Sequence, residues 1–209
     1  MRGLVCALAI ALAPGVASAQ DAPSLIAAAR AEGVFEPASA TAGVVAVRHT
    51  PSGLVCSFGA GDTSRLIVFP QAARGEDVAC ETQAGGVSIR LFATRFSFPT
   101  SLQEQIEGAA GVIERLYPGA QALRTPQAIN DAGLPAYRTV AYLVARDGAQ
   151  SLTSASVAQI GDWVFKLRYT APAGDAEAAR AAANAADRLF AETLRQIVES
   201  RGAHNPPRP

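Results

Sequence analysis

The sequence contains few of the residues on which most catalytic and metal sites depend. Among its 209 residues are two histidines, three cysteines, one methionine and one tryptophan. Nucleophilic triads need a histidine inside the fold. Because His204 lies in the C-terminal tail, only His49 could serve. No C-x-x-C pair occurs, which leaves a thioredoxin-like redox role without its motif. We expect neither a cofactor nor a metal site.

Strong charge and long apolar runs are also missing. The 18 basic residues equal the 18 acidic ones, so no overall charge favours nucleic acid as a partner. Beyond the N-terminus no stretch is long and apolar enough for a transmembrane span. The composition, 49% hydrophobic and 17% charged, is that of a globular chain of roughly one domain.

The N-terminus has the three parts of a secretory signal peptide. Arg2 supplies a positive charge, Leu4–Ala13 is a short apolar stretch, and Ala17-Ser18-Ala19 fits the small-residue cleavage pattern. We expect cleavage after Ala19 and a periplasmic or secreted mature chain. The alternative is a buried apolar helix. Cys6 lies too early for a lipoprotein cleavage site.

Cys56 and Cys80 are the cysteines that remain after the predicted cleavage. In an oxidising compartment two such cysteines normally pair, which leaves no thiolate for zinc. The bond restricts topology, because in a plain meander the intervening strand would separate the two cysteine strands by about 9.5 Å. A disulfide needs Cα atoms within about 7 Å. Either the strand order departs from a meander, or Cys80 lies at a strand end folded over its neighbour.

Runs of alternating or β-branched residues predict about eight strands. They cover residues 44–49, 54–58, 65–69, 78–82, 87–94, 137–146, 150–160 and 163–170. The connections are short, and the pairs Gly85-Gly86, Asp147-Gly148 and Gly161-Asp162 are typical of tight hairpins, which favours antiparallel pairing. Residues 36–39 and 119–134 are expected to form loops.

Caps and breakers predict three helices: a short one from Asp21 or Ser24 to Ala31, one from Ser101 to the Pro118-Gly119 pair, and a long one from Asp175 to about Arg201. Strand runs interrupted by whole helices indicate an α+β fold, with a mainly antiparallel sheet and helices packed against it. We expect a single domain over residues 20–202 and a disordered tail over residues 203–209.

The last predicted strand has one apolar and aromatic face and one polar face. Its apolar face should pack on the long helix through these residues: Trp163, Phe165, Leu167 and Tyr169 on the strand, and Phe190, Leu194 and Ile197 on the helix. A meander that ends in an aromatic strand and a long helix resembles PsbP/Mog1-like domains over the last third of the chain. The resemblance concerns topology and implies no residue roles.

Basic residues concentrate on the predicted strands, whereas most acidic residues lie on the helices. Residues 86–95 and 136–170 hold six basic side chains and only two acidic ones, Asp147 and Asp162, both in turns. One interpretation is a solvated face whose arginines pair with helix carboxylates. The other is a binding face for anions, since arginine grips carboxylate or phosphate bidentately. The proposed ligand-binding residues are Arg90, Arg138, Lys166 and Arg168.

Two classes of function therefore stay open. The first is a non-catalytic binding or accessory module of the cell envelope, which uses a sheet face or a groove beside the long helix to bind an anionic ligand or an acidic protein. The second is an envelope hydrolase with a dispersed site near His49, which lies beside Thr50 and Ser52. The scarcity of histidine and the missing motifs favour the module.

Overall fold

The structure is a computed structural model that describes residues 21–131, 133–146 and 148–204. The predicted cleavage site after Ala19 and the end of the predicted tail beyond His204 lie outside the described residues. The elements follow in this order: α1 (Ala22–Ala28), β1 (Phe35–Pro37), β2 (Val44–His49), β3 (Leu54–Gly59), β4 (Thr63–Val68), β5 (Asp77–Ala84), β6 (Val87–Arg95), α2 (Leu102–Leu116), β7 (Gln121–Ile129), β8 (Tyr137–Arg146), β9 (Ala149–Ile160), β10 (Trp163–Pro172) and α3 (Ala176–His204).

The strands of the described chain form two sheets. A small sheet has the order β1-β2-β3, and a seven-stranded sheet has the order β4-β5-β6-β10-β9-β8-β7. All of these strand pairs are antiparallel. The predicted α+β class, the mainly antiparallel pairing and the long C-terminal helix are therefore confirmed. Two strands exceed the predicted eight, β1 and β7.

Strand β7 corrects the prediction that residues 119–134 form a loop. Its pairing with β8 shifts register between Ala122 and Arg124 and again between Arg124 and Gln127. These irregularities remove the period of two on which strand prediction depends. The strand also contains Pro126, which lacks a backbone N–H and is tolerated because β7 is an edge strand.

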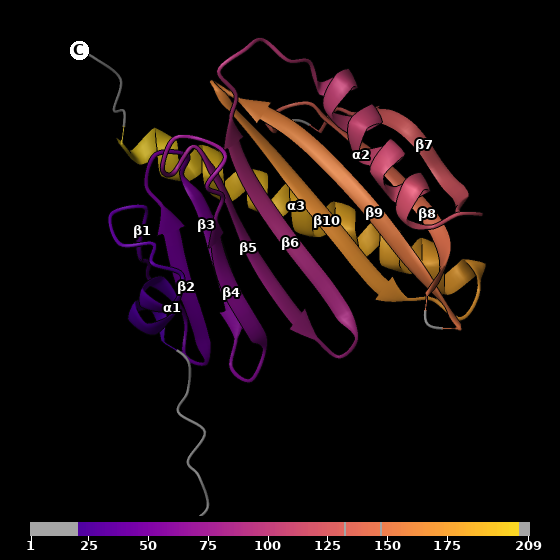
Figure 1. Ribbon diagram of the computed structural model, residues 1–209, viewed down its shortest axis with the longest axis horizontal. Helices are drawn as coiled ribbons and strands as arrows, with labels where there is room; N and C mark the ends of the chain where they lie inside the picture. Colours follow the sequence, from indigo (N-terminus) through magenta and orange to yellow (C-terminus); the bar gives the residue numbers. More distant parts are fainter. Residues whose placement is uncertain (1–20, 132, 147, 205–209) are drawn as a thin grey trace, which may run out of the picture.

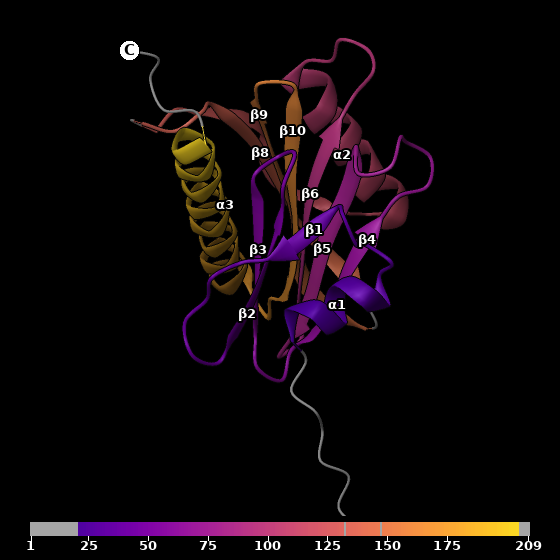
Figure 2. The ribbon, with the colours of Figure 1, turned by 90° about the vertical axis from the view of Figure 1, so that its left-hand side faces the viewer.

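The seven-stranded sheet is the middle layer of the molecule (Figures 1 and 2). Helix α3 and the small sheet lie on one side of it, which we call the inner face. Helix α2 lies on the opposite side, the outer face. Each face has its own hydrophobic cluster, because successive residues of a strand point to opposite sides.

The helices begin where the sequence predicts. The Ser101 hydroxyl accepts from the backbone N–H of Glu104, whose carboxylate accepts in return from the backbone N–H of Ser101. The Asp175 carboxylate accepts from the N–H groups of Glu177 and Ala178 at 2.9 and 2.8 Å. Such caps satisfy backbone donors that have no partner inside the helix.

The inner face carries the larger core. As predicted, the apolar side of β10 and the apolar side of α3 share one cluster, which contains the following residues: Trp163, Phe165, Leu167, Tyr169, Phe190, Leu194 and Ile197. Phe165 is 1% exposed and Phe190 is fully buried. Burial of such side chains stabilises a fold by about 1.5–3 kcal/mol each, which makes this layer the main source of stability.

The disulfide joins the two sheets. Cys56 lies on β3 of the small sheet and Cys80 on β5 of the large one, with their Cα atoms 6.2 Å apart. The strand order therefore departs from a meander, which was the first of the two predicted solutions. Because β3 and β4 belong to different sheets, no strand separates the two cysteines.

Candidate functional site

The register of the large sheet brings charged residues from four strands into one row on the outer face. Arg65 on β4 pairs with Glu81 on β5, Glu81 pairs with Arg90 on β6, and Arg90 pairs with Arg168 on β10. In the row beside it, Lys166 pairs with Phe92. Strands β6 and β10, which are far apart in the sequence and both carry basic residues, are thus direct neighbours.

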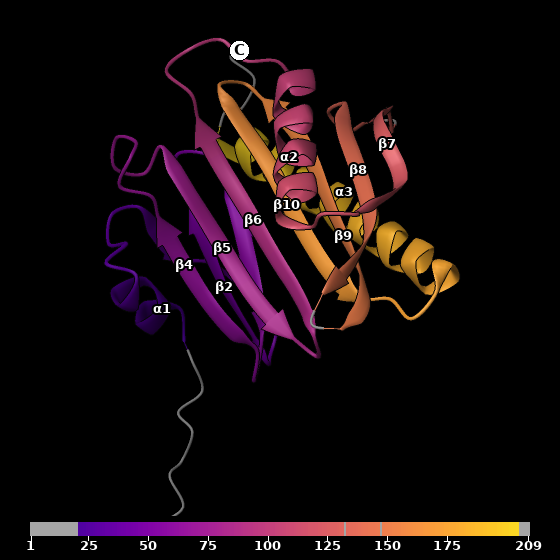
Figure 3. The ribbon, with the colours of Figure 1, turned by 45° about the vertical axis from the view of Figure 1, so that its right-hand side comes forward.

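This part of the outer face is left open by α2. The helix packs against β8 and β9 and covers Val164 at one end of β10. Figure 3 shows β4, β5 and β6 without a helix in front of them. Lys166, Arg168 and Arg90 are half-buried by their neighbours but remain accessible from solvent.

Glu81 is the carboxylate that anchors the row. Its side chain is only 7% exposed, and it forms ion pairs with Arg65 on one side and Arg90 on the other. Burial alone would raise the pKa of Glu81, but hydrogen bonds from Arg65 and Arg90 outweigh burial and lower it. Arg90 is therefore held in place from the β5 side, away from Arg168.

Lys166 and Arg168 have no such partner. Within the described part of the chain, neither side chain has a carboxylate at ion-pair distance. Burial lowers the pKa of Lys166, and the neighbouring Arg168 lowers it further, while Asp77 acts in the opposite direction. Burial and the nearby Arg90 likewise lower the pKa of Arg168. Both cations thus lie in a setting that disfavours positive charge.

An aromatic ring holds two of the cations in position. The guanidinium of Arg90 lies 5.9 Å and the ammonium of Lys166 5.8 Å from the centre of the Phe92 ring. Phe69 stacks on Phe92, with 6.2 Å between the ring centres. Cation–π contacts of this kind are attractive and restrict the long basic side chains.

Four cations therefore stand against two carboxylates on this open surface. We call it the basic face and define it by these residues: Arg65, Asp77, Glu81, Arg90, Lys166 and Arg168. Asp77 is half-buried and accepts a hydrogen bond from Thr94 at 2.8 Å. Burial raises the pKa of Asp77, against the effects of Thr94 and Lys166.

Arg138 lies away from the other predicted site residues. It is in the row of Lys166, but Val157 on β9 stands between them, and Val157 belongs to the cluster beneath α2. Arg138 faces Ala128 of β7 on its other side. The structure thus brings together Arg90, Lys166 and Arg168 and leaves Arg138 two strands from Lys166.

His49 sits in a closed environment. It is 0% exposed, as is Ser52, and its Nδ1 lies 2.7 Å from the Ser52 hydroxyl oxygen. The Ser52 hydroxyl also accepts from the backbone N–H of Leu54, and the imidazole packs against Phe35 and Trp163. Burial lowers the pKa of His49 to about 4. The pair closes the turn between β2 and β3, and a substrate has no open path to it.

Among the described residues, no group of three or more histidine, cysteine, aspartate or glutamate side chains could hold a metal ion. None of the described helices, α3 included, combines the length and hydropathy needed to cross a membrane.

A cleft does exist beside the long helix. It has a volume of about 130 Å³ and lies between α3, β3 and β6, lined by apolar residues such as Phe58 and Leu91 and by polar residues of α3 such as Glu192. Cavities that bind small molecules usually measure roughly 300–1,000 Å³. This cleft accommodates a group about the size of a side chain, which makes it a weaker candidate than the basic face.

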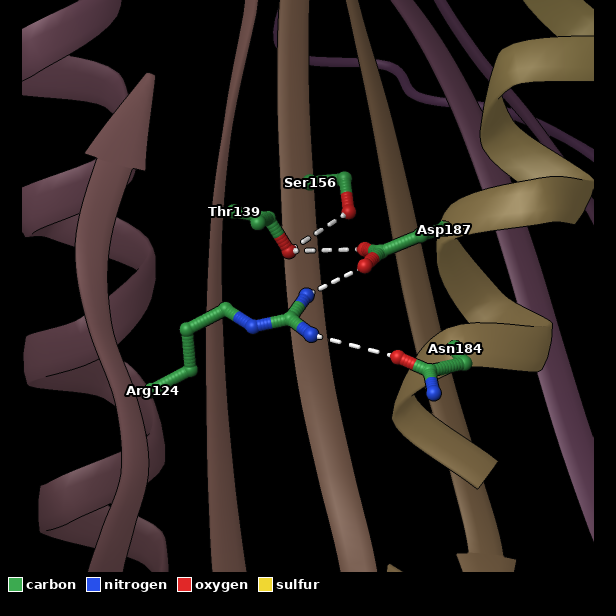
Figure 4. A network of polar contacts seen from close by, with 5 residues as sticks. All are labelled: Arg124, Thr139, Ser156, Asn184 and Asp187. Carbon is green, nitrogen blue, oxygen red and sulfur yellow. Dashed lines mark hydrogen bonds and ion pairs between the residues drawn. The ribbon is translucent and has the colours of Figure 1, made fainter. Parts of the chain in front are cut away.

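A second polar network, shown in Figure 4, ties the irregular edge strand to α3. Arg124 on β7 forms an ion pair with Asp187 on α3 and donates a hydrogen bond to Asn184 at 3.4 Å. Thr139 donates to Asp187, and Ser156 donates to Thr139. Every charge in this network has a partner, which identifies it as a structural connection.

Comparisons with known proteins find no family model that matches the chain and no match among curated proteins. Solved structures similar to this chain include the following three. Cyanobacterial PsbP (CyanoP) from Synechocystis has a TM-score of 0.49 and 14% identity, over 74% of this chain and 92% of its own. LpqN, involved in cell envelope biogenesis of Mycobacterium tuberculosis, has a TM-score of 0.41 and 12% identity, over 82% of this chain and 96% of its own. A Pseudomonas aeruginosa protein of unknown function has a TM-score of 0.39 and 13% identity, over 68% of this chain and 92% of its own. No residue role is carried over from these proteins.

The sequence did not reveal the importance of Glu81, Arg65 and Phe92. Each occupies an ordinary strand position, and only the pairing register makes them neighbours of Arg90 and Lys166. One signal was available: Glu81 is a lone acidic residue within a short, otherwise uncharged run, Val78–Thr82. A charge at such a position indicates a partner on the next strand.

Proposed function

We propose that this protein is an exported, non-catalytic binding module that holds an anionic ligand of the cell envelope, or an acidic protein, on its basic face. One observation carries the proposal: Lys166 and Arg168 are half-buried cations on an uncovered sheet surface, with no carboxylate at ion-pair distance in the described chain. A purely structural charge would find a partner or extend into water.

The competing interpretation was that acidic helices cover these cations. The partner of Arg65 and Arg90 is Glu81, a strand residue, and the residue near Arg168 at the end of α2 is its C-cap, Tyr117, rather than a carboxylate. The helices therefore do not neutralise this surface. An incoming anion would supply the opposite charge that Lys166 and Arg168 lack.

The test uses the chain from Gln20 onward. It is titrated with vesicles of phosphatidylcholine alone, vesicles that also contain phosphatidylglycerol, and soluble peptidoglycan fragments, each at low and high salt. We expect binding to an anionic probe that weakens with salt, because surface charges are screened beyond about 8–10 Å at physiological ionic strength.

Charge reversal locates the binding surface. Lys166→Glu and Arg168→Glu should each weaken binding by about tenfold or more, which corresponds to about 1.4 kcal/mol. The matched control is Arg180→Glu, an exposed position on α3 and thus on the other side of the sheet. If the control weakens binding as much as the two variants, or if no anionic probe binds at low salt, the proposal is wrong.

A further inference from the structure

The basic face carries four cations and two carboxylates on a part of the outer face that α2 leaves open. Resting on the binding function proposed above, we propose that the ligand carries a terminal phosphate group held between Arg90 and Arg168, with Lys166 as the third cation. This assigns a chemical class to the ligand and a role to each of three side chains.

The first argument is the charge balance of the face. Its two carboxylates offset two of its four cations, which leaves an excess of two positive charges. A phosphate monoester carries a charge of about −1.5 to −2 at pH 7, because its second pKa is about 6. A carboxylate or a phosphodiester carries only one negative charge and would leave the face positive.

The second argument is the position of the two guanidinium groups. Arg90 and Arg168 are direct cross-strand partners, so their Cα atoms lie about 4.5–5.5 Å apart. Like charges directly opposite each other destabilise a sheet. Glu81 binds Arg90 from β5, on the side away from Arg168, so it leaves the space between the two arginines without an anion.

The third argument concerns the number of acceptor atoms. A guanidinium fork binds two oxygens in parallel, so one arginine uses both oxygens of a carboxylate. Arg168 offers its whole fork, while Arg90 is already paired with Glu81 and offers only its remaining N–H groups. Together with the ammonium of Lys166, these donors suit a group with three acceptor oxygens, which a terminal phosphate has. Phe92 contacts Arg90 and Lys166 and keeps both near this point, and Tyr117, the C-cap of α2, lies near Arg168.

The phosphate could belong to a soluble molecule or to a lipid headgroup, and two sets of probes distinguish them. The soluble set is glycerol 3-phosphate, dimethyl phosphate and acetate, titrated calorimetrically at equal ionic strength. The lipid set is phosphatidylcholine vesicles that contain either phosphatidic acid, a monoester, or phosphatidylglycerol, a diester. We expect a preference for the monoester of about tenfold or more in at least one set.

The decisive variants keep or remove the planar fork of Arg168. Arg168→Lys preserves the charge but has no fork, so it should lose the preference for the monoester while it keeps weak, salt-sensitive binding. Arg168→Gln should lose both, and Arg180→Lys and Arg180→Gln should leave both unchanged. Circular dichroism of each variant establishes that it is folded.

The outcomes separate this inference from the broader function. If phosphatidylglycerol vesicles bind as tightly as phosphatidic acid vesicles and acetate binds as tightly as glycerol 3-phosphate, the phosphate assignment is wrong and the anion-binding function stands. The assignment is also wrong if Arg168→Lys retains the full preference for the monoester. If no anionic probe binds, both fail.

Discussion

The inner and outer faces of the large sheet share the same strands, but along β10 the two faces differ in chemistry. On the inner face of β10, all five alternating residues are buried against α3 and the small sheet. On the outer face the same strand begins with the buried Val164, beneath α2, and continues with the half-buried Lys166 and Arg168. The change occurs where α2 ends its coverage (Figure 3).

This difference shows how one strand can serve stability and recognition together. The inner face gains free energy from apolar burial, which requires complete coverage by other elements. The basic face gains no such energy, and it holds Lys166 and Arg168 in a setting that lowers their pKa values. Sites that tolerate such unfavourable charge are often functional ones.

The largest expected effect is on the inner face. Phe165→Ala should lower the free energy of unfolding by about 3–5 kcal/mol, because it removes a ring that is 1% exposed and leaves a cavity. Lys166→Ala, one residue on and on the outer face, should change it by less than about 1 kcal/mol. Urea unfolding of both variants measures the contrast. A loss below 1 kcal/mol for Phe165→Ala would mean that Phe165 does not lie on the inner face.

Reduction of the disulfide tests how strongly the stability of the inner layer depends on the covalent link between the two sheets. Reduction of Cys56–Cys80, whose sequence separation is 24, should cost about 3–3.5 kcal/mol by the chain-entropy model. The measurement is guanidinium unfolding of the oxidised and reduced chain from Gln20. Thiol titration of the denatured, unreduced protein should find no free thiol; two reactive thiols would contradict the bond.

Acidification should weaken the inner layer through His49. Its pKa in the folded state, about 4, lies below the unfolded value of 6.5, so the unfolded chain takes up the proton first. Stability due to neutral His49 is present above pH 6.5 and is lost as the pH falls towards 4. Linkage gives a loss of about 2 kcal/mol between pH 7.5 and pH 5.

The control for this titration is His49→Gln, which removes the ionisable group. Between pH 7.5 and pH 5, the free energy of unfolding of this variant should avoid most of the loss of about 2 kcal/mol that is expected for the natural chain. A natural chain whose free energy of unfolding is constant from pH 7.5 to 5 would mean that His49 is not buried in the neutral form.

The smallest expected effect belongs to the outer face. Arg168→Met should leave the free energy of unfolding within about 1 kcal/mol of the natural chain or raise it, because it removes a half-buried charge that faces Arg90. The same substitution should weaken binding to the anionic probe that the natural chain binds. A loss of 2 kcal/mol or more in urea unfolding would show that Arg168 contributes to stability and would remove the contrast between the faces.

Much of the architecture could be predicted from local patterns. Ser101 and Asp175 marked helix starts because a cap depends on residues within one turn. The alternation from Trp163 to Thr170 assigned each side chain to one of two faces. Strand β7 escaped prediction because its shifted register and Pro126 remove the local period, and Arg124 is connected by residues on β8 and α3 far along the chain.

By itself the sequence determined the class of fold, the cysteine pair and the faces of β10, because each depends on neighbours along the chain or on composition. Only the tertiary structure decided that β6 lies beside β10, which makes Arg90 the partner of Arg168 and moves Arg138 away. The placement of α2 over β8 and β9 then left the basic face uncovered. Strand order and helix coverage depend on contacts between distant segments, and no local pattern specifies them.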